Sequence, residues 1–174
     1  MAMKFLNFRI SAAAGFIFFT SVSVAAADYV RIRGTRTSLQ PPKGFSLADR
    51  FPGFQRADVQ SSIMVTEIRA PAAEMMKGKT KEGLAARGMT LISSNAEKIG
   101  GRQALLLHVA QNAAGAAFLK WMLVTGDQNT SLMIVGTFPK AAEARVGAAI
   151  KSAVLTASWT PGGSTDHFEG LPFR

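Results

Sequence analysis

The sequence predicts an α+β fold in which an antiparallel β-sheet is sandwiched between helices. Four β-type segments follow one another between residues 89 and 137, and their short connections can join only antiparallel neighbours. The central segments carry apolar residues on both faces, which indicates a sheet that is covered on both sides. Residues 139–156 have apolar side chains at helical spacing and supply one of these covers.

The first 27 residues are expected to be a signal peptide. Lys4 and Arg9 provide a positive start, residues 10–24 are uncharged and largely apolar, and residues 25–27 are small. The alternative is a membrane anchor, which requires about 20 apolar residues, and this stretch is shorter and is interrupted by polar residues. We therefore expect a periplasmic or secreted protein, cleaved near Ala27, with no transmembrane segment in the mature chain.

The rest of the chain is expected to form one domain and a tail. The full chain has 174 residues, a length that suits a single domain of ordinary size. We place this domain at residues 28–160 and a flexible, glycine-rich tail at residues 161–174. No internal repeat divides the domain further.

The domain begins with an irregular segment and a strand. Residues 28–60 are punctuated by prolines and glycines and are expected to lie across the core through their phenylalanines. Residues 61–69 alternate as a strand does, with Ile63 and Val65 on one face and Met64 on the other.

Residues 71–88 predict a weak helix or two short helices. Pro71 suits the first turn of a helix, Thr80 can cap a second helix, and Gly88 suits its C-terminal end. Gly78 and Gly83 weaken the helix interior, so tertiary packing must hold it. This segment and the phenylalanine-rich loop are available to cover the sheet face opposite the C-terminal helix.

Next comes the predicted meander, with the C-terminal helix after it. Gly100 and Gly101 suit a hairpin turn that requires positive φ. Pro139 suits the start of the helix. The four strands of the meander are expected at residues 89–98, 102–111, 116–125 and 130–137.

The chain is strongly basic. It has 20 Lys and Arg against 11 Asp and Glu, and a formal net charge of +9, which falls by two when Lys4 and Arg9 leave with the signal peptide. Outside the cytoplasm such a charge favours an acidic protein partner or an anionic surface, with peripheral membrane contact. Nucleic acid is not expected as a partner.

No catalytic or metal-binding constellation is recognisable. The chain has no cysteine, which excludes disulfide scaffolds, zinc ribbons and cysteine nucleophiles, and no phosphate-cradle or nucleophile-elbow motif occurs. Ser164, Asp166 and His167 are the residue types of a hydrolase triad, but a glycine-rich tail offers them no rigid support. Asp166, His167 and Glu169 have no distant partner to close a metal site. We expect no enzymatic activity, no metal and no cofactor.

Four residues are candidates for a binding role: Lys120, His108, Arg31 and Arg33. Lys120 shares a strand face with apolar residues, so its ammonium group either extends to the sheet edge or marks a cleft between sheet and helix. His108 is expected to be hydrogen-bonded at the rim of the core, with a ligand or pH-sensing role as the alternative. Arg31 and Arg33 are expected on a solvated edge strand rather than in a binding stripe, and residues 77–81 in a solvated helix connection.

Several motifs resemble those of the PsbP-like superfamily. They are Pro-Pro-Lys-Gly-Phe at 41–45, Phe-Pro-Gly-Phe at 51–54, Thr-Lys-Glu-Gly-Leu at 80–84, Ile-Gly-Gly-Arg-Gln-Ala at 99–104, Phe-Leu-Lys-Trp at 118–121 and Val-Gly-Thr-Phe-Pro at 135–139. The resemblance covers most of the mature chain. It implies an antiparallel sheet between helical layers and a role as an accessory protein that contacts partners, and it carries hardly any implication of activity.

These observations favour an exported, non-enzymatic accessory or binding protein of the bacterial cell envelope, which contacts a protein partner or an anionic envelope component. The alternative is a small-molecule or lipid-binding module that uses a cleft between sheet and helix, and a hydrolase is least favoured. A pocket of about 300 Å³ or more with converging polar groups would favour the alternative. A flat, basic and partly apolar surface would favour the partner.

Overall fold

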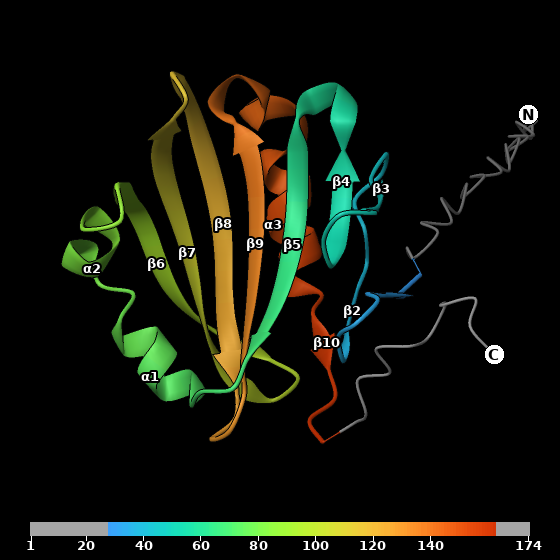
Figure 1. Ribbon diagram of the computed structural model, residues 1–174, viewed down its shortest axis with the longest axis vertical. Helices are drawn as coiled ribbons and strands as arrows, with labels where there is room; N and C mark the ends of the chain where they lie inside the picture. The colour runs from blue at the N-terminus through green and yellow to red at the C-terminus, as the bar shows by residue number, and fades with distance from the viewer. Residues whose placement is uncertain (1–27, 163–174) are drawn as a thin grey trace, which may run out of the picture.

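The computed structural model describes residues 28–162, which form two antiparallel sheets and a small number of helical segments (Figure 1). The predicted α+β fold is confirmed. The predicted signal peptide, most of the predicted tail and the cluster around Ser164, Asp166, His167 and Glu169 lie outside the described residues.

The main sheet has seven strands in the order β3-β4-β5-β9-β8-β7-β6. The four-stranded meander predicted from the sequence corresponds to β6–β9, which pair in succession, and β5 pairs with β9. The strands are β3 (Ser46–Leu47), β4 (Gly53–Arg56), β5 (Ser61–Ile68), β6 (Met89–Ile99), β7 (Arg102–Ala113), β8 (Ala116–Gly126) and β9 (Ser131–Pro139).

Residues 28–60 contain more regular structure than the sequence predicts. They contribute β3 and β4 to the main sheet, and a short 3₁₀ turn, η1 (Ala57–Val59), leads into β5. They also contribute β1 (Val30–Arg31) and β2 (Thr37–Leu39), which form a separate three-stranded sheet with β10 (Ser158–Trp159). These strands are only two to four residues long, so the local sequence carries little signal for them.

The segment that follows β9 covers one face of the main sheet. It consists of the 3₁₀ turn η2 (Lys140–Ala142), the π-helical turn η3 (Glu143–Gly147) and the helix α3 (Ala148–Leu155). The predicted C-terminal helix is confirmed, although only its second half is α-helical. A Cβ atom on Gly136 of β9 would overlap the side chain of Ile150, so this glycine lets α3 lie directly on the sheet.

The main core lies between the sheet and α3. Phe45 and Leu47 of the phenylalanine-rich loop pack against this same core. The prediction that the loop covers the opposite face is therefore wrong. The reason is that Phe54 on β4 pairs with Ile63, whose side chain belongs to the core beneath α3. Fully buried core members include Phe54, Ile63, Leu106, Leu123, Ile134, Phe138, Ile150 and Val154.

The opposite face of the main sheet is only partly covered. Two short helices, α1 (Ala72–Lys77) and α2 (Lys81–Ala85), lie over it on the side of β6, β7 and β8 (Figure 1). Leu84 of α2 packs against Leu107, Val109 and Met122, while Met64 on β5 remains 41% exposed. We call this side of the sheet the open face. The two-sided cover predicted from the sequence is incomplete there.

No helix among residues 28–162 is long and apolar enough to cross a membrane.

Candidate functional site

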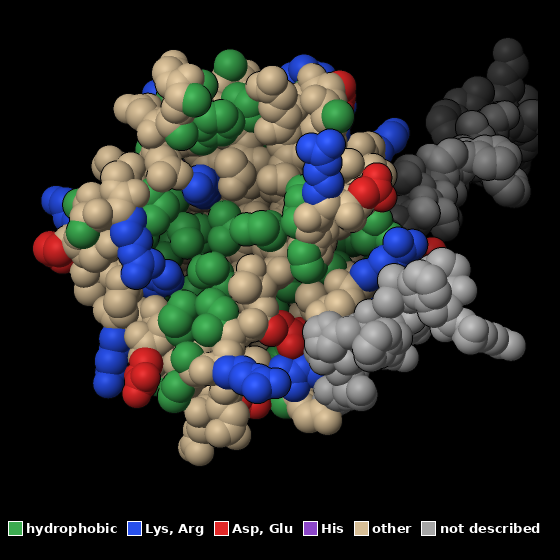
Figure 2. Space-filling view, viewed as in Figure 1, with side chains coloured by type: hydrophobic (Ala, Val, Ile, Leu, Met, Phe, Trp, Pro, Cys, Tyr) green, Lys and Arg blue, Asp and Glu red, His purple; other side chains and the backbone are tan. Residues whose placement is uncertain are grey.

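Apolar rows of side chains cross the open face. Residues that stand opposite one another on antiparallel strands share a face, so the register defines each row. Figure 2 shows apolar side chains gathered in the middle of this face. One row is Met64, Val135, Met122 and Leu107, and the next is Thr66, Met133, Val124 and Leu105.

The adjoining row on the open face is polar. It consists of Gln55 on β4, Ser62 on β5, Thr137 on β9 and Lys120 on β8, and we call it the polar row. All four residues are half-buried. None of their side chains is hydrogen-bonded or ion-paired to another residue within the described part of the chain. With strands about 4.8 Å apart, the row spans roughly 14 Å.

Lys120 is the only cation of the polar row. β8 lies inside the sheet, between β7 and β9, so Lys120 stands on the open face and not at a sheet edge. Burial lowers its pKa, and no charged group contributes to the shift. Loss of hydration disfavours the charged form of the ammonium group. No anionic partner among the described residues compensates for this loss.

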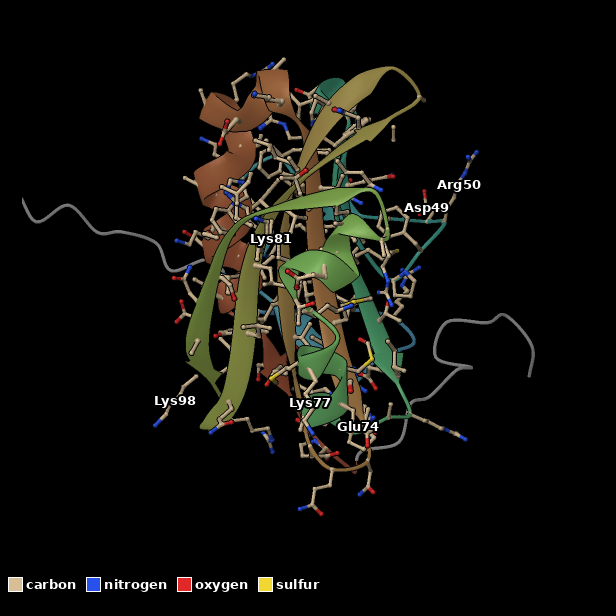
Figure 3. All side chains as sticks on the ribbon, turned by 90° about the vertical axis from the view of Figure 1, so that its left-hand side faces the viewer. Asp49, Arg50, Glu74, Lys77, Lys81 and Lys98 are labelled. Atoms are coloured by element: carbon tan, nitrogen blue, oxygen red, sulfur yellow. The ribbon has the colours of Figure 1, made fainter. Side chains whose placement is uncertain are left out.

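A second buried ammonium group lies between α1 and α2. Lys79 is 7% exposed, and its pKa is lowered first by burial and then by repulsion from Arg87. Lys77 and Lys81 on either side are exposed (Figure 3). The predicted solvated connection is therefore wrong at Lys79. A tight turn, in which the Lys79 amide donates to the carbonyl of Met76 at 3.0 Å, directs this side chain inward.

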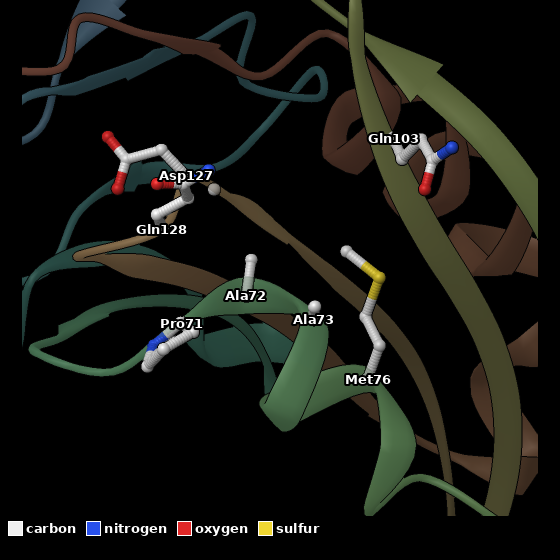
Figure 4. Close-up of a pocket in the computed structure, with 8 residues that line it drawn as sticks. Pro71, Ala72, Ala73, Met76, Gln103, Asp127 and Gln128 are labelled. Carbon is white, nitrogen blue, oxygen red and sulfur yellow. The ribbon is translucent and has the colours of Figure 1, made fainter.

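A pocket of about 350 Å³ lies where α1 meets the turn between β8 and β9 (Figure 4). It is lined by Pro71, Ala72, Ala73, Met76, Gln103, Gly126, Asp127 and Gln128. Gly126 and Gln103 share a sheet face with Val124 and Leu105, because side chains alternate along a strand. The pocket therefore continues the apolar rows of the open face toward α1.

Asp127 provides the carboxylate of this pocket, and its side chain is hydrogen-bonded within the turn between β8 and β9. It accepts hydrogen bonds from the backbone N–H groups of Asn129 and Thr130, both at 2.8 Å. These bonds lower its pKa and outweigh the opposing effect of burial. A carboxylate held in its charged form by backbone donors serves as a turn-forming group and is a poor general acid.

His108 lies on the face beneath α3 and not on the open face. Its ring stacks on Trp121, with centroids 4.1 Å apart and planes inclined by 10°, and Lys151 of α3 places its ammonium group 4.9 Å from the Trp121 ring centroid. The expected hydrogen bond is absent: Nε2 is buried without a partner among the described residues. Burial lowers the pKa of His108, Glu143 opposes this shift, and Lys151 reinforces it.

Arg31 lies in an edge strand of the three-stranded sheet, and Arg33 lies in the turn that follows it. β1 is an edge strand of that sheet, both arginines are exposed, and Ile32 between them is fully buried. The sequence-predicted candidates are therefore not brought together. Lys120 stands on the open face, His108 on the opposite face, and the two arginines on a different sheet.

Two further hollows carry positive charge, but their arginines already have partners. In one, of about 410 Å³, Arg56 and Arg145 contact Asp58 at 3.0 and 3.7 Å. In the other, of about 400 Å³, Arg102 lies over the Trp159 ring at 5.4 Å from its centroid. No group of three or more His, Asp or Glu that could hold a metal ion occurs among residues 28–162. The open face combines exposed apolar surface with half-buried polar side chains that have no partner within the described chain, and it is therefore the candidate site.

Sequence reasoning identified Lys120 but missed the rest of the polar row. Alternation along residues 61–69 places Ser62 on the same face as Met64, which is a usable signal for one more member. Thr137 joins the row through its pairings with Lys120 and Ser62, and Gln55 joins it through its pairing with Ser62. The sequence does not give the register of these pairings.

Three solved structures share this fold at low sequence identity. Cyanobacterial PsbP (CyanoP) from Synechocystis sp. PCC 6803 aligns with a TM-score of 0.54 and 14% identity, over 82% of this chain and 98% of that chain. PA94, a protein of unknown function from Pseudomonas aeruginosa, aligns with a TM-score of 0.52 and 17% identity, over 79% and 98%. LpqN of Mycobacterium tuberculosis, involved in cell envelope biogenesis, aligns with a TM-score of 0.54 and 16% identity, over 72% and 83%. No protein-family model and no curated protein sequence matches the chain.

Proposed function

Because the chain has a PsbP-like fold, we propose that it is a non-enzymatic binding protein of the bacterial cell envelope that takes up a lipid-like molecule on its open face. The proposal rests on the incomplete cover of this sheet face by α1 and α2. Met64 is 41% exposed beside the half-buried Met133 and Val135. Contiguous exposed apolar surface is a mark of ligand or partner contact, and methionine side chains adapt to ligands of varied shape.

The envelope location rests on two supports. The pattern of residues 1–27 is typical of a signal peptide. LpqN, which shares the fold, is involved in cell envelope biogenesis. The non-enzymatic part of the proposal rests on the sequence, which offers no nucleophile, base and orienting acid on rigid elements.

The pocket beneath α1 favours a ligand over the protein partner that the sequence favoured first. Its volume of about 350 Å³ falls in the range of small-molecule sites. The polar row supplies polar groups beside the same apolar surface. Attraction of the basic chain to an anionic envelope surface stays a prediction of the sequence.

A fluorescence titration tests the proposed function. The purified protein should bind the uncharged apolar probe N-phenyl-1-naphthylamine saturably. Met64→Glu should weaken binding by about tenfold or more, because it places a charge on the apolar surface. The matched control is Ile92→Glu, which changes an apolar residue that is 52% exposed at the bulge of β6 and should bind like the unmodified protein.

Circular dichroism should show that both variants are folded. Absence of saturable binding would exclude the open face as a lipid-binding site. An equal loss in Met64→Glu and Ile92→Glu would show that the probe does not report on this face.

A further inference from the structure

We infer that the open face binds a single-chain amphiphile with a carboxylate head group, such as a long-chain fatty acid, with the head group on the polar row and the chain directed to the pocket beneath α1. This inference rests on the proposed function and specifies the chemical class of its ligand. It rests on charge, hydrogen bonding, the length of the apolar path and the position of the strands within the sheet.

The charge of Lys120 favours an anionic ligand. Lys120 is half-buried, stands opposite Val109 and Thr137, and is followed on the same face by Met122. No ion pair among residues 28–162 includes it. A carboxylate would replace the lost hydration with a charge-assisted hydrogen bond. A single ammonium group matches a ligand with a single negative charge.

Two hydroxyl groups in the polar row can donate hydrogen bonds to the same ligand. Thr137 stands directly opposite Lys120, and Ser62 stands opposite Thr137 on the next strand. Each hydroxyl group can donate one hydrogen bond, and neither is engaged elsewhere in the described chain. The two oxygens of a carboxylate can therefore accept from the Lys120 ammonium group and from the Thr137 hydroxyl group.

An apolar path runs along the open face from Lys120 to the pocket at α1. Lys120 and Gly126 lie on the same face of β8, roughly 20 Å apart at about 3.4 Å per residue. Between the polar row and the pocket, the path on β9 crosses the half-buried Val135 and Met133. The pocket at its end is lined by apolar groups that include Ala73 and Met76. A long acyl chain can follow this path, and a shorter acid covers less of the apolar surface along it.

The position of the strands in the sheet favours a lipid over an acidic peptide as the ligand. The strands that carry the site, β5, β9 and β8, are interior strands, so their backbone groups are already paired within the sheet. A peptide laid across this face would leave its own amide groups without partners, which is unfavourable. An acyl chain has no such groups.

Competition for the bound probe tests the inference. Dodecanoate should displace N-phenyl-1-naphthylamine at least tenfold better than dodecanol, because one charge-assisted hydrogen bond accounts for about this factor. Octanoate should compete more weakly than dodecanoate, and dodecyltrimethylammonium should be the weakest twelve-carbon ligand. Lys120→Gln should abolish the preference for the acid over the alcohol. Lys120→Arg should retain part of it, and Lys140→Gln, at an exposed lysine before α3, should retain all of it.

Several outcomes would overturn the inference. They are equal competition by dodecanol and dodecanoate, a preference that survives Lys120→Gln, and displacement by an acidic peptide but not by dodecanoate. After either of the first two outcomes the proposed function still stands if Met64→Glu weakens probe binding, whereas displacement by the acidic peptide alone would favour a protein partner and contradict both proposals. If Lys120→Gln does not fold, the comparison of acid, alcohol and cation on the unmodified protein decides.

Discussion

At the scale of single residues, the half-buried Lys120 and the buried Lys79 act against the stability of the fold. Burial lowers the pKa of both Lys120 and Lys79, so folding is accompanied by an unfavourable loss of ammonium hydration. Lys120 weakens the folded state while it stands on the candidate binding face, and this combination is typical of a functional position.

We therefore expect Lys120→Met to stabilise the protein at neutral pH by about 0.5–2 kcal/mol and to lose the preference for an acidic ligand. Methionine is similar in length and has no charge to desolvate. Urea denaturation followed by circular dichroism measures the free energy of unfolding, with Lys140→Met as the exposed control. A destabilised Lys120→Met variant would mean that the ammonium group contributes to stability.

His108 predicts a pH dependence of stability. Its pKa in the folded state lies below the ordinary value because of burial, so the unfolded state binds the proton first on acidification. Stability due to this group should be complete above about pH 6.5 and should fall as the pH decreases toward the folded-state pKa.

Thermal unfolding between about pH 5 and 7.5 measures this effect. His108→Phe retains an aromatic ring beside Trp121 and should show a smaller decrease. His167 is present in both proteins and contributes equally to each. An identical pH dependence in the two proteins would contradict the assignment to His108.

At the scale of elements, the contact of α3 with β9 depends on a residue without a side chain. Gly136 lies under Ile150, and the added carbon of an alanine would meet the γ2 methyl group of that fully buried residue. The methyl group is on a β-branched side chain, which has little freedom to move away. The helix would have to shift.

Gly136→Ala should accordingly destabilise the protein by about 1–3 kcal/mol, the usual range for overpacking. Gly78→Ala is a suitable comparison, because a Cβ there has its nearest contact at an ordinary 3.8 Å and should change stability little. Urea midpoints of both variants provide the measurement. Similar midpoints for the two would show that α3 adjusts without strain.

The elements also show which parts of the fold a sequence can predict. Strands β6–β9 have long alternating or apolar runs and short turns, and the segment 139–156 has helical periodicity, so local patterns are sufficient. The pairing of β2 with β10 joins the two ends of the described chain, and no local pattern carries it. For the same reason Lys120 could be assigned to a face from alternation, whereas Gln55 could not be assigned to the polar row.

At the scale of the whole molecule, one carboxylate links the two sheets. Glu67 of β5 accepts from the backbone N–H of Arg36 at 2.6 Å and from its Nε at 2.8 Å, and it also contacts the Thr37 hydroxyl group at 3.3 Å. Arg36 in turn lies over the ring of Trp159 in β10, 5.4 Å from its centroid. Glu67 therefore holds the three-stranded sheet against the main sheet.

Glu67→Ala should destabilise the protein by about 1–3 kcal/mol, because it leaves partly buried donors without an acceptor. Asp58→Ala removes the exposed ion pair with Arg56 and should have little effect on the midpoint. Hydrogen exchange should show faster exchange in β1 and β2 of Glu67→Ala. Unchanged exchange in these strands would show that the pairing with β10 suffices to hold them.

The three-stranded sheet also has a consequence for the order in which a newly made chain acquires its structure. β2 lies between β1 and β10, and β10 is the last strand of the described chain to be synthesised. The strands β5–β9 can pair with one another earlier, because their partners lie between residues 61 and 139. β1 and β2 can pair locally, but β2 gains its second partner strand only when the C-terminal segment has been made, so the three-stranded sheet is completed last.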